Sequence, residues 1–126
     1  MPMERFELWL HRFADAWRVG DPDAVSDLFA PDARYQDEPF SQPLEGVDAI
    51  RGYWEQGIRH SRRDVEFEAQ ALGVGDRGGL AHWRGEFTSA PAEHRVQLDG
   101  ILLANIDDDG RCTDFREWWH RREDHE

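Results

Sequence analysis

The sequence contains no lysine, a single cysteine and no long hydrophobic run. Positive charge therefore rests on 15 arginines against 27 acidic residues, which gives a formal net charge of −12. The arginines are interspersed with acids, as in RVGDPD, RRDVEFE and WHRRED. Nucleic acids and anionic membrane surfaces are bound by clustered basic side chains, so we predict no nucleic-acid partner and no membrane partner.

The lone cysteine, Cys112, excludes an internal disulfide framework and a cysteine-based metal site. We interpret it as a small filler on a strand. No apolar run approaches the roughly 18 residues that a transmembrane helix needs, and the acidic N-terminus lacks a signal-peptide pattern. These absences predict a soluble, cytoplasmic protein.

Aromatic residues are abundant: six Trp, seven Phe and two Tyr in 126 residues. A chain of this length forms one domain, here 1–126, and buries roughly two thirds of its unfolded surface. The low mean hydropathy therefore reflects a highly charged surface and not a lack of core material, which argues against disorder.

The first half of the chain has the spacing of helices. Residues 3–19 carry one apolar stripe at helical spacing, and Gly20 ends that helix. A second short helix begins with Asp21 as N-cap and Pro22 at the first helical position, and Pro31 is expected to end it.

Alternating patterns follow, interrupted by one more helix. We expect a short strand at 32–37, a third helix at 46–60 with Ile50, Tyr53, Trp54 and Ile58 buried, and strands near 65–73, 80–89, 94–106 and 112–121. The segment DDDGR, residues 107–111, is a strong hairpin turn, and the tail 122–126 is expected to be disordered. Three helices, one short strand and a four-strand meander predict an α+β domain in which the helices wrap a curved antiparallel sheet.

Three segments, GDPDAVSDLFAPDARYQD, EGVDAIRGYW and DDDGRCTDFREWW, in this order and at this spacing, carry a family resemblance. The chain resembles the SnoaL-like branch of the nuclear transport factor 2-like superfamily over nearly its whole length. The resemblance implies a cone-shaped α+β barrel with a cavity for a hydrophobic small molecule, no cofactor, and a homodimer formed through the outer sheet face. It does not by itself imply one activity, because this superfamily includes isomerases, dehydratases, epoxide hydrolases, cyclases and non-catalytic binders.

Ketosteroid isomerase, a member of that superfamily, permits a comparison by residue. Its general-base aspartate precedes a proline-bearing loop and a glycine, and this chain resembles it in having Asp37 nine residues before Gly46. The resemblance implies that Asp37, and not Glu38, points into the cone. Alternation agrees, because Tyr35 and Asp37 share one face of the strand and Glu38 falls on the other.

The resemblance also shows departures. Positions that bear the tyrosines of the oxyanion hole and its support in ketosteroid isomerase carry Phe13, Phe29 and Trp54 here, and the position of its protonated aspartate carries Leu102. An oxyanion hole without its donors loses several kcal/mol of transition-state stabilisation. Isomerisation of a ketosteroid by that set of donors is therefore not expected.

The strand register predicts which side chains line the cavity. Its polar groups are Asp37, Tyr35 and Glu117, which we assign as candidate catalytic residues. Two carboxylates in one apolar cavity are expected to raise the pKa of one of them, which suits acid–base catalysis near neutral pH. The expected substrate-binding residues are Phe13, Trp17, Trp54, Trp83, Leu102, Phe115 and Trp119.

Simpler interpretations exist for the polar residues. Asp37 can instead cap its own loop through the backbone N–H of Phe40 or Ser41, and Glu117 can pair with an arginine such as Arg84, Arg95 or Arg116. Arg84 and Glu86 have the spacing of an Arg and an acid in limonene epoxide hydrolase, but the register turns them outward. His82, His94 and His120 lie on separate strands with no metal-binding spacing, so no metal is expected.

Two functions remain open from the sequence. The first is a small cofactor-independent isomerase, cyclase or dehydratase that moves a proton through Asp37 on a hydrophobic carbonyl compound. The second is a non-catalytic binding or accessory module with the same cavity. The missing oxyanion donors favour the second, and Asp37 in its loop favours the first.

Overall fold

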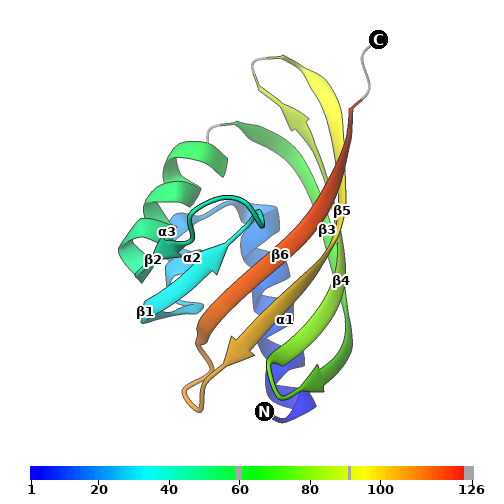
Figure 1. The fold of residues 1–126 in the computed structure, drawn as a ribbon. Coiled ribbons are helices and arrows are strands. Elements are labelled where there is room, and N and C mark those ends of the chain that lie inside the picture. The colour runs from blue at the N-terminus through cyan, green and yellow to red at the C-terminus, as the bar shows by residue number, and fades with distance from the viewer. Residues whose placement is uncertain (59–60, 91, 124–126) are drawn as a thin grey trace.

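Three helices lie against one face of a single curved sheet (Figure 1). The computed structural model describes residues 1–58, 61–90 and 92–123. The sheet has six strands in the order β2-β1-β6-β5-β4-β3. The elements are α1 (Met3–Val19), α2 (Pro22–Ser26), β1 (Phe29–Gln36), β2 (Leu44–Glu45), α3 (Val47–Tyr53), a π-helical turn (Trp54–Ile58), β3 (Arg62–Gly75), β4 (Gly78–Ser89), β5 (His94–Ile106) and β6 (Cys112–Glu123). The predicted α+β fold is confirmed.

Backbone conformation and a side-chain hydrogen bond determine where α1 ends and where α2 begins. Gly20 follows α1 with φ of 72°, a left-handed conformation that glycine adopts without steric cost, and its N–H donates to the Ala16 carbonyl. The Asp21 side chain caps α2 by accepting from the backbone N–H of Asp23.

Pro31 does not end the second helix, which corrects the prediction. That helix stops at Ser26, and Pro31 lies inside β1. The parallel pairing of β1 with β6 shifts register between Phe29 and Arg34, and Pro31, which has no N–H to donate, falls within this interval. Because β1 runs parallel to β6 while the other neighbours are antiparallel, the sheet is mixed and not purely antiparallel.

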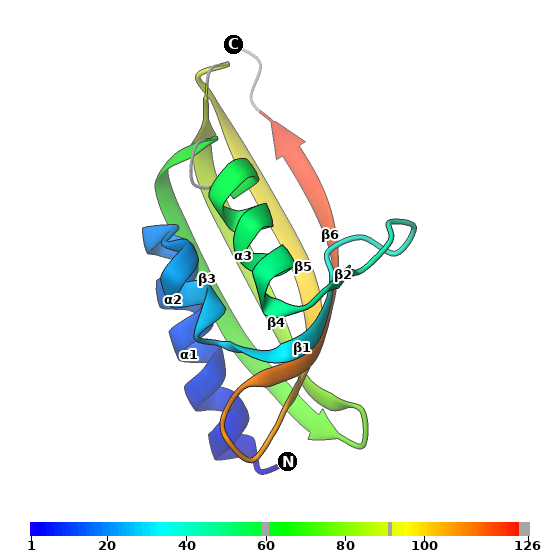
Figure 2. The same ribbon diagram turned by 90° about the vertical axis from the view of Figure 1, so that its left-hand side faces the viewer.

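The third helix is shorter than predicted. It is α-helical only to Tyr53 and continues as the π-helical turn from Trp54 to Ile58. Ile50 and Trp54 are fully buried, as the apolar stripe indicates, whereas Tyr53 is half-buried. Residues 59 and 60 of the expected helix lie outside the described residues. Figure 2 shows α3 in front of the sheet, with α1 and α2 beside it.

The prediction that residues 122–126 form a disordered tail is also partly wrong. Arg122 and Glu123 belong to β6, where they pair with Gln97 and Val96 of β5. Antiparallel pairing with a long neighbouring strand supplies their backbone hydrogen bonds. The rest of the predicted tail, residues 124–126, lies outside the described residues.

Strand alternation sends aromatic and aliphatic side chains of β4, β5 and β6 toward the helices. Gly100 is essential to this packing, because a Cβ at this position would lie 2.3 Å from the Trp118 carbonyl oxygen and 2.9 Å from the Trp119 Cβ. The inward positions on these strands alternate with outward ones: Ala81, Trp83, Gly85, Phe87, Leu98, Gly100, Leu102, Ala104, Phe115 and Glu117 are all buried.

Candidate functional site

Asp37 lies directly after β1 at the edge of the ring-filled interior. Its side chain is half-buried, and its Oδ2 accepts a hydrogen bond of 2.5 Å from the Tyr53 hydroxyl. Its backbone carbonyl accepts from the Trp119 indole N–H at 2.6 Å. These two bonds tie the residue to α3 and to β6.

Glu38 is exposed, and its carboxylate accepts from the Ser41 hydroxyl at 3.2 Å. The backbone N–H of Ser41 donates to the Glu38 carbonyl. The side chain that interacts with the loop is therefore that of Glu38, and the alternative in which Asp37 caps the loop is not what the structure shows.

Tyr35 is buried on β1 and stacks on Phe115, with ring centroids 4.7 Å apart. The two residues are register neighbours on parallel strands. Burial raises the pKa of the Tyr35 hydroxyl well above its usual value, and the negative charges of Glu117, Tyr53 and Asp37 would raise it further. Tyr35 is thus a neutral phenol that can donate a hydrogen bond but not a base.

Glu117 is the buried carboxyl group of β6, with 9% of the residue exposed. Burial raises its pKa to about 8, the charge of Asp37 adds to the rise, and Arg62 opposes it. At neutral pH the group therefore keeps its proton and can donate a hydrogen bond.

The arginines proposed as partners of Glu117 pair with other acids. Arg84 binds Asp99 at 3.2 Å and Arg116 lies 3.8 Å from Asp114. Arg95 contacts Glu66 and Glu86 at 3.3 and 3.2 Å. All three extend from the outer side of the sheet, since arginine on an inward position would meet the aromatic core.

Two polar residues near Asp37 do not follow from the sequence pattern. The apolar stripe of the third helix predicts a buried Tyr53, yet its hydroxyl is the donor to Asp37. Arg62, at the start of β3, belongs to the mixed charged segment RRDVEFE, yet it lies close enough to Tyr53, Tyr35 and Glu117 to interact with them electrostatically. The sequence does contain a signal for Tyr53, because a tyrosine on an apolar stripe needs a hydrogen-bond partner for its hydroxyl.

The predicted substrate-binding residues are brought together, but as packed rings. Trp17 lies 4.6 Å from Phe67 and 6.1 Å from Trp54, measured between ring centroids, and Phe13 lies 5.3 Å from Phe115. Trp119 is half-buried at the edge, while the other predicted members are buried: Phe13, Trp17, Trp54, Trp83, Leu102 and Phe115. A ligand in the cone therefore requires side chains at its mouth to move, and an interior cavity stays a prediction.

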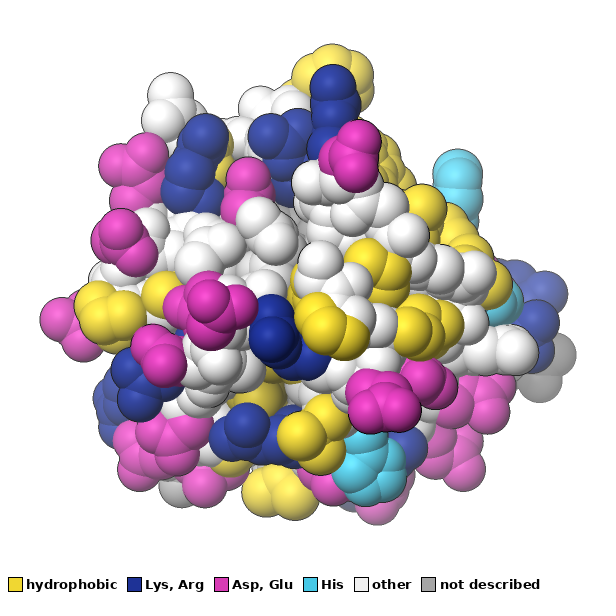
Figure 3. All heavy atoms as spheres, turned by 90° about the horizontal axis from the view of Figure 1, so that it is seen from below, with side chains coloured by type: hydrophobic (Ala, Val, Ile, Leu, Met, Phe, Trp, Pro, Cys, Tyr) yellow, Lys and Arg dark blue, Asp and Glu magenta, His cyan; other side chains and the backbone are white. Residues whose placement is uncertain are grey.

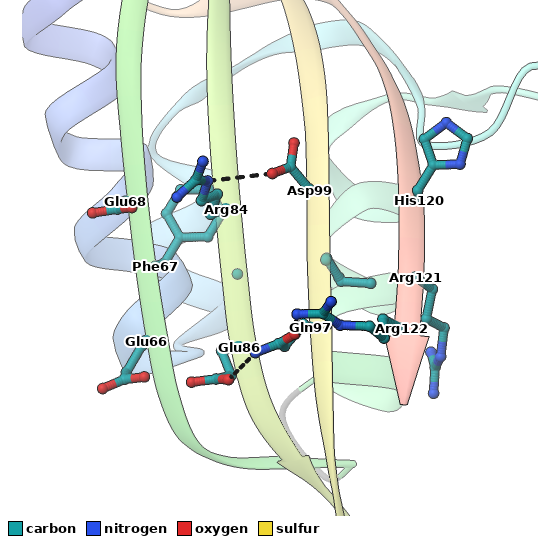
Figure 4. A pocket seen from close by; sticks show the side chains of 12 residues that line it. Glu66, Phe67, Glu68, Arg84, Glu86, Gln97, Asp99, His120, Arg121 and Arg122 are labelled. Atoms are coloured by element: carbon teal, nitrogen blue, oxygen red, sulfur yellow. Dashed lines mark hydrogen bonds and ion pairs between the residues drawn. The ribbon is translucent and has the colours of Figure 1, made fainter. Parts of the chain in front are cut away.

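A broad hollow of about 820 Å³ lies instead on the outer face of the sheet (Figure 4). Its polar groups interact with one another: Arg84 pairs with Asp99, and the Gln97 amide donates to Glu86 at 2.8 Å. Arg84 and Glu86 are thus on the outer face, as the register predicted, and not beside Asp37. Viewed from below in Figure 3, acidic and basic side chains are mixed over the surface, with hydrophobic groups gathered between them.

Metal-ligand groupings are also not seen: among residues 1–58, 61–90 and 92–123, no three His, Cys, Asp or Glu side chains are close enough to hold an ion. His82 contacts Asp99 at 2.8 Å and His94 contacts Glu123 at 3.4 Å. Cys112 is buried, and burial raises the pKa of its thiol.

None of the described helices is long and apolar enough to cross a membrane.

A curved sheet wrapped by three helices is the α+β fold of nuclear transport factor 2-like proteins. Residues 10–115 match the model of the SnoaL-like domain family. The chain belongs to this family.

Individual relatives agree with this assignment. The chain is 25% identical to a steroid Δ-isomerase of Nocardioides simplex, over 86% of this chain and 84% of that protein. Its fold is similar to that of Δ5-3-ketosteroid isomerase from Mycobacterium sp., with a TM-score of 0.79 at 16% identity, over 95% of this chain and 98% of the other. It is also similar to that of SalBIII, an epoxide hydrolase/cyclase-like enzyme in pyran ring formation of the polyether salinomycin, with a TM-score of 0.78 at 21% identity, over 93% and 91%.

Proposed function

We propose that the protein is a cofactor-independent isomerase or cyclase that moves a proton on a hydrophobic carbonyl compound. One observation carries the proposal: Glu117 and Asp37 belong to one electrostatic cluster, and Glu117 keeps its proton while Asp37 accepts a hydrogen bond from Tyr53. A carboxyl group that keeps its proton is suited to act as the acid in a reaction in which a second carboxyl group nearby is the base.

In the proposed reaction, the Asp37 carboxylate removes a proton from a carbon next to the carbonyl group. The electron pair of that C–H bond forms a C=C bond, and the carbonyl π electrons move to the oxygen. The neutral Glu117 or the Tyr35 hydroxyl donates a hydrogen bond to this enolate oxygen. Asp37 then returns its proton to another carbon of the conjugated system, so the product is an isomer and no co-reactant is consumed.

The position of Glu117 is relevant to the hydrogen-bond donor that is absent at Leu102. The resemblance to ketosteroid isomerase places the second acid of that enzyme at Leu102, which has no donor. In the sheet, Glu117 of β6 is the direct antiparallel partner of Leu102 of β5. Directly paired residues of adjacent strands have neighbouring side chains on one face, so an acid on the next strand offers a replacement donor.

The second candidate function is a binding module without catalysis. It is favoured by the absence of tyrosine hydroxyl groups at Phe13, Phe29 and Trp54, and by the packing of the rings that would have to hold a substrate. The two functions differ in whether removal of the Asp37 charge changes a chemical rate.

The test compares Asp37→Asn with Glu38→Gln, two adjacent changes that remove one charge each with little change in shape. The substrate is a Δ5-3-ketosteroid, the compound class named for the relatives, and the rise in absorbance of the conjugated product is measured. Asp37→Asn is expected to lower the rate by at least roughly a hundredfold, because a general base is lost. Glu38→Gln is expected to leave the rate and the melting temperature unchanged. Full activity of Asp37→Asn would contradict the role of Asp37, and an unchanged chain inactive on a panel of carbonyl compounds would favour the binding module.

A further inference from the structure

Backbone pairing between β1 and β6 ends just before Asp37. Gln36 is the last residue of β1, and its register partner on β6 is Arg116. Beyond this pair β6 continues to Glu123, whereas the chain leaves β1 and enters a loop that extends away from the sheet (Figure 2). The described pairing of β1 with β6 therefore stops short of Asp37, so another contact has to fix Asp37 next to β6.

A side chain provides that contact. Trp119 lies on the part of β6 beyond the pairing with β1, and its indole N–H donates a hydrogen bond of 2.6 Å to the backbone carbonyl of Asp37. Hydrogen bonds within the loop shape the loop itself: the Gln36 amide donates to the carbonyls of Pro39 and Ser41 at 3.2 and 3.1 Å. The bond from Trp119 is different in kind, because it joins the start of the loop to the sheet.

Trp119 is also the inward residue that follows Glu117 on β6. The two residues alternate with the exposed Trp118, so their side chains share one face of the sheet. Gly100, the direct partner of Trp119 on β5, has no side chain, and a Cβ there would lie 2.9 Å from the Trp119 Cβ. Trp119 therefore has room at this position, and it fastens Asp37 to the strand that carries Glu117.

The electrostatic interaction of the two carboxyl groups depends on their separation. Burial is the larger cause of the raised pKa of Glu117, and the charge of Asp37 adds to it. A Coulomb interaction weakens as two charges move apart and become better hydrated. A contact that fixes Asp37 on β6 therefore also determines how strongly Asp37 acts on Glu117.

We propose that Trp119 is a positioning residue, which sets the separation of Asp37 from Glu117 by holding the Asp37 backbone on β6. The sequence predicts Trp119 as a substrate-binding residue, whereas here its N–H is used by the protein itself. The inference deepens the proposed function, because it names what determines the distance between the base and the acid. It rests on that function only for its effect on catalysis, since the hydrogen bond and the interaction of the two acids require no substrate.

The first test measures the interaction of the two acids without turnover. The pKa of Glu117 is obtained from the NMR signal of its carboxyl carbon, identified by its loss in Glu117→Gln. Asp37→Asn is expected to lower this pKa, because a neighbouring charge is removed. In combination with Trp119→Phe, which keeps a ring and removes the N–H, Asp37→Asn is expected to lower it by only about half as much.

Trp118→Phe is the matched control, because it makes the same change on the opposite face of the same strand. Asp37→Asn is expected to keep its full effect on Glu117 in combination with this control. An effect of Asp37→Asn that is equal with and without Trp119→Phe overturns the proposal. An effect that Trp118→Phe reduces to the same extent overturns it as well.

Kinetics of the same variant separate positioning from substrate contact. With a carbonyl compound that the unchanged chain converts, Trp119→Phe is expected to lower kcat about tenfold with KM nearly unchanged, because a misplaced base slows proton transfer. A raised KM at constant kcat would make Trp119 a substrate contact and overturn the proposal. If no compound is converted, the proposed function fails, while the NMR comparison still decides the role of Trp119.

Should Trp119→Phe fail to fold, hydrogen exchange in the unchanged chain decides instead. The indole proton of Trp119 is expected to exchange with deuterium at least about tenfold more slowly than that of free indole, because it is held in a hydrogen bond. Asp37→Asn is expected to keep this slow exchange, since the acceptor is the backbone carbonyl of residue 37. Exchange as fast as in free indole would overturn the proposal.

Discussion

At the scale of single residues, the site depends on how burial separates two carboxyl groups. Glu117 is enclosed by β5, β6 and the aromatic interior, where a charge would lose its hydration. Asp37 lies at the edge, where it is half-buried and accepts a hydrogen bond from the Tyr53 hydroxyl. Glu117 is therefore shielded from solvent, whereas Asp37 stays partly exposed.

This difference predicts a pH dependence of stability. The pKa of Glu117 is about 8 in the folded chain, above the ordinary 4.5 of an exposed glutamate. Between these values the folded chain keeps a proton that the unfolded chain releases, so this group contributes stability that is full below pH 4.5 and is lost as pH rises through 8. Urea unfolding at pH 5, 7 and 9 is expected to show wild type losing stability relative to Glu117→Gln, by an amount on the order of a few kcal/mol. A constant difference between the two proteins would contradict the assignment.

The pH dependence of the activity is expected to follow the ionisation of Glu117 as well. If neutral Glu117 donates to the enolate oxygen, the rate falls as pH rises through about 8, because the ionised form has no proton to donate. The alkaline fall is expected to disappear in Glu117→Gln, whose amide N–H donates at every pH, although its rate is lower overall. If the rate of Glu117→Gln still decreases at alkaline pH, the decrease is caused by the ionisation of another group.

Tyr53 is a positioning residue for Asp37. Tyr53→Phe removes the 2.5 Å hydrogen bond and leaves the ring in place. We expect kcat to fall about tenfold, because a hydrogen bond to a charged group is lost, with KM nearly unchanged. The melting temperature should change little, since the side chain is only half-buried. A raised KM at constant kcat would instead place Tyr53 in substrate binding.

At the scale of elements, close packing of β5 against its neighbours depends on Gly100. Gly100→Ala brings a methyl group within 2.3 Å of the Trp118 carbonyl oxygen, which is backbone and cannot rotate away. We expect a loss of roughly 1–3 kcal/mol of unfolding free energy, as in other overpacked sites. Gly73→Ala on β3 is the matched control, since its added Cβ has nothing within 4 Å. Equal urea midpoints for the two variants would be contrary to this account.

Sequence periodicity determines the elements well where pattern and packing agree. The long strands and the first helix follow from alternation and helical spacing. Gly20 ends the first helix through its left-handed φ, and Asp21 begins the second helix through its side-chain hydrogen bond. The end of the second helix and the parallel β1–β6 pair do not follow, because proline is compatible with either a helix end or a strand irregularity, and strand direction depends on contacts between distant residues.

The same limit applies to the site. Alternation placed Asp37 and Glu38 on different sides and turned Glu117 inward, because a strand allows only two directions. Arg62 was missed because its burial results from Trp17 and Phe87, which lie 45 and 25 residues away in the chain. The local charge pattern indicates a solvated arginine at that position, and only the folded chain shows that its Nη1 is buried without a hydrogen-bond partner.

At the scale of the whole molecule, the outer face of the sheet carries an uncovered apolar patch. Leu80 pairs with Leu103, and Ile101 pairs with Trp118, so these four side chains adjoin across β4, β5 and β6. Trp118 is 43% exposed and Leu80 is 42% exposed. A contiguous apolar surface on a soluble chain marks a contact with another molecule.

We predict that this patch joins two copies of the chain into a homodimer, as the resemblance to the superfamily implies. A two-fold contact brings the same patch from each copy together, so one substitution alters the interface twice. Sedimentation at micromolar concentration is expected to give a mass near two chains, and Trp118→Arg is expected to shift it toward one chain, because two buried arginines would face each other. Leu8→Arg, an exposed leucine on α1, is the control and should leave the dimer intact. A mass near one chain for the unchanged protein would overturn the prediction, and a dimer that is lost equally in both variants would place the interface elsewhere.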